Sequence, residues 1–130
     1  MGFSKKGLRK MIRNDRVFYW CVKNDNEDDD RMYIVIQSED KKFSISYMLA
    51  QQDKERPFSP INPFIIVKGK EFKGLNHLGK CWERFLVPHW KEDDAITPSF
   101  IGEIIDWCFT NEDVTSVNYK GEIMSERRQV

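Results

Sequence analysis

The sequence lacks an excess of charge of either sign. Its 130 residues include 21 Lys and Arg and 21 Asp and Glu, so the formal net charge is zero. A uniformly basic nucleic-acid binder is therefore excluded. Hydrophobic residues make up 40% and aromatic residues 13%, too many for a disordered tail, while 32% charged residues are too many for a membrane protein. The composition indicates a globular domain, and the length fits one domain, 1–130.

Long apolar runs are also missing. No stretch approaches the roughly 18 apolar residues of a membrane-spanning helix, and residues 1–16 contain no apolar run of the kind found in signal peptides. The three cysteines are widely spaced, and an odd number leaves one thiol unpaired in any disulfide scheme. We therefore expect a cytoplasmic protein with reduced thiols and no membrane contact.

The sequence motifs of common enzymes are absent as well. The chain has no glycine-rich phosphate loop, nucleophile elbow, His-Glu-x-x-His pair or paired-carboxylate signature. His77, Cys81 and His89 form the only cluster with the character of a metal site or a nucleophile. His77 and Cys81 lack the second ligand pair that zinc sites usually have. A thiol nucleophile at Cys81, activated by one of the two imidazoles, is the enzymatic hypothesis that these residues support.

An acidic segment, 25–30, concentrates carboxylates as a cation site would. An EF-hand loop needs a glycine at its sixth position for a sharp turn, and Asp30 stands there instead. We expect a solvated loop, and the sequence predicts no metal and no cofactor.

The neutral total hides a strong segregation of charge. Residues 1–23 carry seven basic residues and one acid, five acids follow within 25–30, and a second acidic region covers 92–113. The basic segment suggests an alternative function, a nucleic-acid accessory protein that contacts phosphates. Its candidate contact residues are Lys5, Lys6, Arg9, Lys10, Arg13 and Arg16. The cations either fold against the acids or lie opposite them and give the molecule a dipole.

The first half of the chain predicts an antiparallel meander of four strands. Two runs, 8–14 and 17–24, flank Asn14-Asp15-Arg16, whose Asn and Asp tolerate left-handed turn conformations, so we predict a β-hairpin. Further strands are expected at 32–38 and at 43–49, where apolar and polar residues alternate. Several cations of the first strand are expected to project outward.

The second half is less regular. A proline-rich connection is expected over 51–63, a strand over 64–67 and a loop over 71–79. The segment 82–90 fits either a short helix stopped by Pro88 or an extended strand, and 114–119 fits a late strand.

One helix is predicted near 98–110. Thr97 is a suitable N-cap, and Pro98 suits the first helical position. Apolar residues then recur at three- and four-residue spacing and form one stripe, which should pack on a face of the sheet. These residues are Phe100, Ile101, Ile104, Ile105, Cys108 and Phe109. The predicted fold class is α+β, an antiparallel sheet of five or six strands with one main helix.

A group of short motifs carries a resemblance to a protein family. Gly7-Leu8-Arg9-Lys10 is followed by Tyr19, Trp20 and Val22, and Ile96-Thr97-Pro98 opens a helix ended by Ile104-Ile105. This pattern resembles small uncharacterised bacterial proteins with a Gly-x-Arg hairpin and an Ile-Thr-Pro helix. The resemblance implies a bacterial cytoplasmic origin and an antiparallel sheet with a helix, and it implies no activity and no site residues.

The missing catalytic motifs favour a non-enzymatic protein-interaction module, such as a small cytoplasmic partner or immunity-type protein, that binds another protein or itself. The basic hairpin supports the nucleic-acid alternative, and Cys81 supports a thiol-dependent enzyme as the third hypothesis. The four tryptophans are expected in the core, although an exposed one would suit an interface anchor. They are Trp20, Trp82, Trp90 and Trp107.

Overall fold

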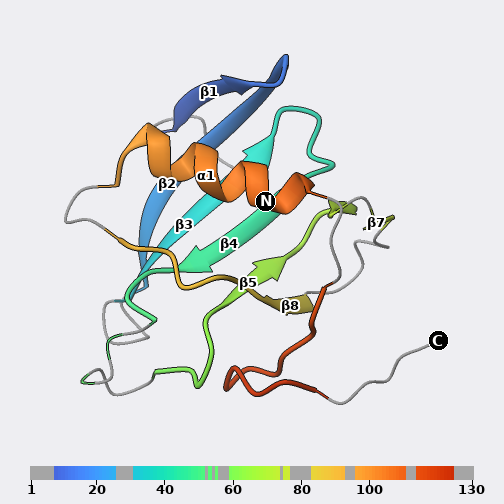
Figure 1. Cartoon of the computed structure of the whole chain (residues 1–130). Helices are drawn as coiled ribbons and strands as arrows, with labels where there is room; N and C mark the ends of the chain where they lie inside the picture. The colour runs from blue at the N-terminus through green and yellow to red at the C-terminus, as the bar shows by residue number, and fades with distance from the viewer. Residues whose placement is uncertain are drawn as a thin grey trace.

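The computed structural model describes residues 8–25, 31–51, 53, 55, 59–73, 75–76, 83–92, 96–110 and 114–124. Within these residues the chain forms one six-stranded antiparallel sheet with the helix α1 (Pro98–Phe109) across one face, as Figure 1 shows. The sheet order is β1-β2-β3-β4-β5-β8, and β6 and β7 form a separate small pair. The predicted α+β class, with an amino-terminal meander and one main helix, is confirmed. The strands are β1 (Arg9–Arg13), β2 (Arg16–Asp25), β3 (Arg31–Ser38), β4 (Ser44–Met48), β5 (Phe64–Val67), β6 (Glu71–Phe72), β7 (Leu75–Asn76) and β8 (Glu83–Leu86).

The β1–β2 hairpin turns through two residues. Asn14 and Asp15 both have positive φ, 54° and 62°, which these side chains tolerate better than most. Two such residues give a turn whose twist matches that of the flanking strands. Arg13 therefore lies directly opposite Arg16, and this register fixes which residues of β1 face the helix.

Both ends of α1 are held by residues outside the helix. Thr97 Oγ1 accepts a hydrogen bond from the backbone N–H of Phe100 at 3.3 Å, and Pro98 occupies the first turn. At the carboxyl end, Lys73 donates its backbone N–H to the carbonyl of Cys108 at 2.7 Å. The ammonium group of Lys73 also lies near this end of the helix, where a cation complements the helix dipole.

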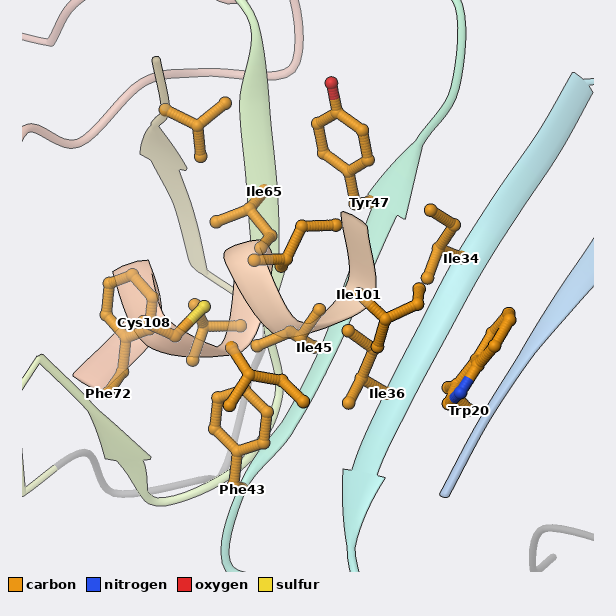
Figure 2. Packing of buried hydrophobic residues seen from close by; sticks show 14 of the residues in the cluster. Trp20, Ile34, Ile36, Phe43, Ile45, Tyr47, Ile65, Phe72, Ile101 and Cys108 are labelled. Atoms are coloured by element: carbon orange, nitrogen blue, oxygen red, sulfur yellow. The ribbon is translucent and has the colours of Figure 1, made fainter. Parts of the chain in front are cut away.

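The core lies between α1 and the sheet. Figure 2 shows Ile101 and Cys108 of α1 together with Ile34, Ile36 and Ile45 from the strands that the helix covers. All five are fully buried. Removing a side chain of this size from water stabilises a fold by roughly 1.5–3 kcal/mol, so this layer holds the helix in place.

Three expectations for the second half of the chain can be compared with the structure. Two of them need correction, and one open alternative is decided. The segment 71–79 was predicted as loop, yet it contains the short β6–β7 pair. The segment 82–90, left open between helix and strand, contains β8, because the edge of β5 offers ladder hydrogen bonds in the register Ile65 to Phe85. The segment 114–119, which fitted a late strand, forms no full strand: Ser116 makes an isolated bridge to Phe85 of β8, and Val117 makes one to Ile123.

Candidate functional site

The two edges of the main sheet differ. At the β8 edge, the segment 114–117 covers the strand: Leu86 donates its N–H to the carbonyl of Thr115 at 2.8 Å, and Val117 donates to the carbonyl of Arg84 at 3.0 Å. At the other edge lies β1, seen at the top of Figure 1. Among the residues that the structure describes, no strand and no isolated bridge pairs with the outer side of β1.

The backbone of β1 directs two residues toward that outer side. Arg13 and Arg16 flank the two-residue turn and therefore form a hydrogen-bonded pair. In an antiparallel ladder, hydrogen-bonded pairs alternate with pairs that are not hydrogen-bonded to each other. Arg9 and Met11 therefore bond to β2, whereas the N–H and C=O groups of Lys10 and Ile12 point away from it. The outer edge thus offers two donors and two acceptors.

The side chains along this edge are exposed and mixed in character. Ile12 is 66% exposed, the largest exposure among the exposed large hydrophobic residues of the described chain. Lys10 shares its face of the sheet and is also exposed. Arg9, on the helix side, is exposed and places its guanidinium carbon 5.5 Å from the centre of the Trp20 ring. The edge therefore combines one apolar side chain with two cations.

Arg13 lies on the same face as Arg9 and reaches α1. Its Nε and Nη2 donate to the two carboxylate oxygens of Asp106 at 2.7 and 2.6 Å. The hydrogen bond from Arg13 lowers the pKa of Asp106, and the same bond and the nearby charge raise the pKa of Arg13. Arg13 is thus neutralised by the helix instead of projecting outward as the sequence suggested.

Arg16 is held by a second group of acids. Its Nη2 lies 2.6 Å from Glu71 Oε1 and 3.1 Å from Asp40 Oδ1. Hydrogen bonds from the Ser38 hydroxyl and the Lys42 backbone lower the pKa of Asp40 to about 2, with a further contribution from Arg16. Of the six candidate phosphate contacts, two therefore bind carboxylates within the fold, Arg9 and Lys10 face the open edge, and Lys5 and Lys6 lie outside the described residues.

The described residues do not test the proposed thiol site, because they include only one of its three members. His77 and Cys81 lie outside the described residues, and His89 is exposed beyond the end of β8. The two described cysteines, Cys21 and Cys108, both have a pKa raised mainly by burial. A raised pKa disfavours the thiolate, so neither has the character of an activated nucleophile.

The described tryptophans belong to the core. Trp20 and Trp90 are buried, and Trp107 packs edge-on against Trp90 with ring centres 5.6 Å apart. Trp82 lies outside the described residues. None of the three described tryptophans is therefore an exposed anchor for an interface. The sequence analysis missed the exposed Ile12, because the exposure of this side chain depends on which strands flank β1.

Within the described ranges, no group of three or more His, Cys, Asp or Glu side chains is arranged to hold a metal ion. No helix in this part of the chain has the length and apolar character needed to span a membrane. Comparison with known proteins finds no match among protein-family models, curated proteins or solved structures.

Proposed function

We propose that this protein is a non-enzymatic protein-interaction module that binds an extended segment of another protein along the outer side of β1. The observation that carries the proposal is the contrast between the two sheet edges: 114–117 covers β8, and no described residue pairs with the outer side of β1. An extended segment can add a strand to such an edge, with main-chain hydrogen bonds supplying affinity.

The side chains of β1 support binding in this mode. Ile12 is 66% exposed, and covering it would contribute about 1–2 kcal/mol to the free energy of binding. The pair formed by Arg13 and Asp106 fastens the hairpin to α1. A strand that is already ordered loses little conformational freedom when a partner binds, so more of the contact energy appears as affinity.

The nucleic-acid alternative has less support in the described residues. Phosphate binding requires cations that are free to pair with phosphates, and Arg13 and Arg16 are already paired with carboxylates of the same chain. Strand addition needs only the backbone of β1 and its exposed side chains. A small cytoplasmic partner protein, including one of the immunity type, would act in this way without a catalytic group.

The substitution Ile12→Pro tests the proposal. Proline removes the N–H that points outward and leaves the β1–β2 hydrogen bonds intact, and proline is tolerated on sheet edges. We would select ligands for the wild-type protein from a displayed library of extended peptides, and compare their binding to Ile12→Pro and to the control Ile12→Val. Amide shifts in NMR spectra would verify that the variants fold and that peptides perturb Lys10 and Ile12.

Peptides that bind the wild type and Ile12→Val, but bind Ile12→Pro at least about tenfold more weakly, would support strand addition. Failure to select any peptide, or equal binding to the folded Ile12→Pro variant, would refute it. Tight, salt-sensitive binding of a single-stranded oligonucleotide to the same edge would favour the nucleic-acid alternative instead.

A further inference from the structure

The open edge of β1 has a definite charge pattern. Lys10 and Arg9 are exposed on opposite faces of the strand, and Ile12 is exposed on the face of Lys10. Arg13, the remaining cation of the strand, is neutralised by Asp106. Positive charge is therefore concentrated at the amino-terminal half of β1, and an apolar side chain lies at its carboxyl-terminal half.

We infer that the segment bound at β1 is acidic: an antiparallel strand with an apolar residue opposite Ile12 and carboxylates opposite Lys10 and Arg9. This inference depends on the proposed function, because it specifies the partner of the same edge. Read from its amino end, the ligand has an apolar residue, any residue, and then two acids. Opposite charges directly across an antiparallel pair attract, and like charges repel.

The register follows from the backbone. Lys10 and Ile12 supply the outward N–H and C=O groups, so each forms a hydrogen-bonded pair with the ligand residue opposite. The ligand's apolar residue then continues the row in which Ile12 lies opposite Val17 on β2. The second acid of the ligand lies opposite Arg9. The guanidinium of Arg9 can stay over the Trp20 ring while those of its N–H groups that point away from the ring bind the ligand carboxylate.

A second copy of the chain is a poorer occupant of this edge. Pairing the five residues of β1 with the same five residues of another molecule, in antiparallel sense, places Arg9 opposite Arg13 and sets Lys10 opposite Ile12. Such a dimer places no carboxylate directly opposite Arg9 or Lys10, because Arg13 is a cation already paired with Asp106 and Ile12 is apolar. An acidic strand supplies the opposite charges that a second copy lacks in this register.

The test uses three labelled peptides that differ at two positions: Thr-Val-Thr-Glu-Glu-Thr, the same sequence with Gln-Gln, and the same sequence with Lys-Lys. Their affinities for the full chain are measured by fluorescence anisotropy at low salt. The wild type should bind the Glu-Glu peptide about tenfold more tightly than the Gln-Gln peptide and the Lys-Lys peptide most weakly. The preference for the Glu-Glu peptide should be smaller at about 0.5 M NaCl, because salt screens the attraction between exposed charges.

Charge reversal provides the matched comparison. The double variant Arg9→Glu with Lys10→Glu should prefer the Lys-Lys peptide, whereas Lys91→Glu with Lys120→Glu changes the net charge equally at exposed positions and should keep the wild-type order. Circular dichroism would verify folding of both variants. The inference of an acidic ligand would be overturned if the wild type bound all three peptides with equal affinity. If Ile12→Pro also bound none of them, the proposed function would still stand. No binding of any peptide would count against the proposed function, and a dimer in solution that these peptides cannot dissociate would favour self-association.

Discussion

The guanidinium of Arg13 and the carboxylate of Asp106 form two hydrogen bonds, of 2.7 and 2.6 Å, between residues 93 positions apart in the chain. The pair joins the basic amino-terminal hairpin to the acidic helical region, and Arg16 joins the hairpin to Asp40 and Glu71. Part of the segregated charge is therefore neutralised within the fold. The exposed cations of β1 itself, Arg9 and Lys10, lie along its open edge.

The Arg13–Asp106 pair should show a salt-dependent coupling. Because both side chains are partly exposed, 38% and 47%, salt should screen their attraction. A double-mutant cycle with Arg13→Gln and Asp106→Asn, measured by urea unfolding, should give a favourable coupling free energy at about 0.1 M salt. The coupling free energy should be smaller at about 1 M salt. A coupling that is zero at low salt, or unchanged at high salt, would contradict this expectation.

The same pair should contribute to acid sensitivity. The pKa of Asp106 is lowered in the folded protein by its hydrogen bond from Arg13. Its contribution to the free energy of unfolding is thus complete above the unfolded pKa, about 4, and is lost as the pH falls through the folded value. The difference in stability between the wild type and Asp106→Asn should accordingly narrow below about pH 4. A difference that stays constant down to the acid transition would argue against this linkage.

Gly102 of α1 should respond to substitution in a way that depends on Arg13. A Cβ atom at Gly102 would lie 2.6 Å from Nη1 and 2.8 Å from Cζ of Arg13, so Gly102→Ala must displace the guanidinium. In an Arg13→Ala background, Gly102→Ala should raise the free energy of unfolding by about 0.5–1 kcal/mol, the usual helix preference of alanine. In the wild type the loss of the ion pair should offset this gain. Equal effects in both backgrounds, measured by urea unfolding, would refute the coupling.

Tyr47 should make the fold sensitive to high pH. Its hydroxyl is buried and donates to Glu92 Oε2 at 3.0 Å; burial, and then the charge of Glu92, raise the pKa of Tyr47 far above its ordinary value of 10.0. The folded protein keeps this proton while the unfolded chain releases it, so stability should fall as the pH rises past about 10.

The variant Tyr47→Phe isolates this effect. This variant should have a free energy of unfolding about 1 kcal/mol lower than the wild type near neutral pH, because it loses one hydrogen bond. Above about pH 10, its free energy of unfolding should decline less steeply than that of the wild type. Tyr119→Phe, at a position that is 59% exposed, is the control and should behave as the wild type does. An unchanged alkaline decline in Tyr47→Phe would assign that decline to other groups.

Gln51 should be among the most sensitive polar positions. It is 1% exposed, and its side-chain amide donates to the carbonyls of Met48 and Phe64 at 2.9 and 2.8 Å while accepting from the N–H of Phe64 at 3.0 Å. Gln51→Leu leaves these buried backbone groups without their partner, which should cost about 3 kcal/mol in urea unfolding. Gln37→Leu, on the half-buried face away from α1, should cost no more than about 0.5 kcal/mol. Similar losses at both positions would disprove the bridging role of Gln51.

Several elements were predictable because their signals are local. Asn14 and Asp15 tolerate the left-handed backbone that a two-residue hairpin turn needs, and both adopt it. Thr97 and Pro98 begin the helix as expected, since the N-cap hydrogen bond spans three residues. The alternation over 43–49 marks a strand whose apolar face is buried. Each of these signals involves residues close together in the chain.

Other features were not predictable from neighbouring residues. The segment containing β8 has the composition of either a short helix or a strand, and the ladder from Ile65 to Phe85 decided between them. The position of β1 at an open edge depends on where the remaining strands lie, so the exposure of Ile12 was missed. The candidate site is therefore less visible in the sequence than the fold is.

The sequence by itself determined the hairpin, the meander and the helix, because short-range hydrogen bonds and the period of apolar residues dictate these elements. Only the tertiary structure decided which cations are neutralised and which remain on the surface. Arg13 and Arg9 lie on the same face of one strand, yet only Arg13 comes within hydrogen-bonding distance of an acid on α1. An ion pair depends on the separation of two groups in space, and for residues 93 positions apart that separation is set by how the helix packs on the sheet.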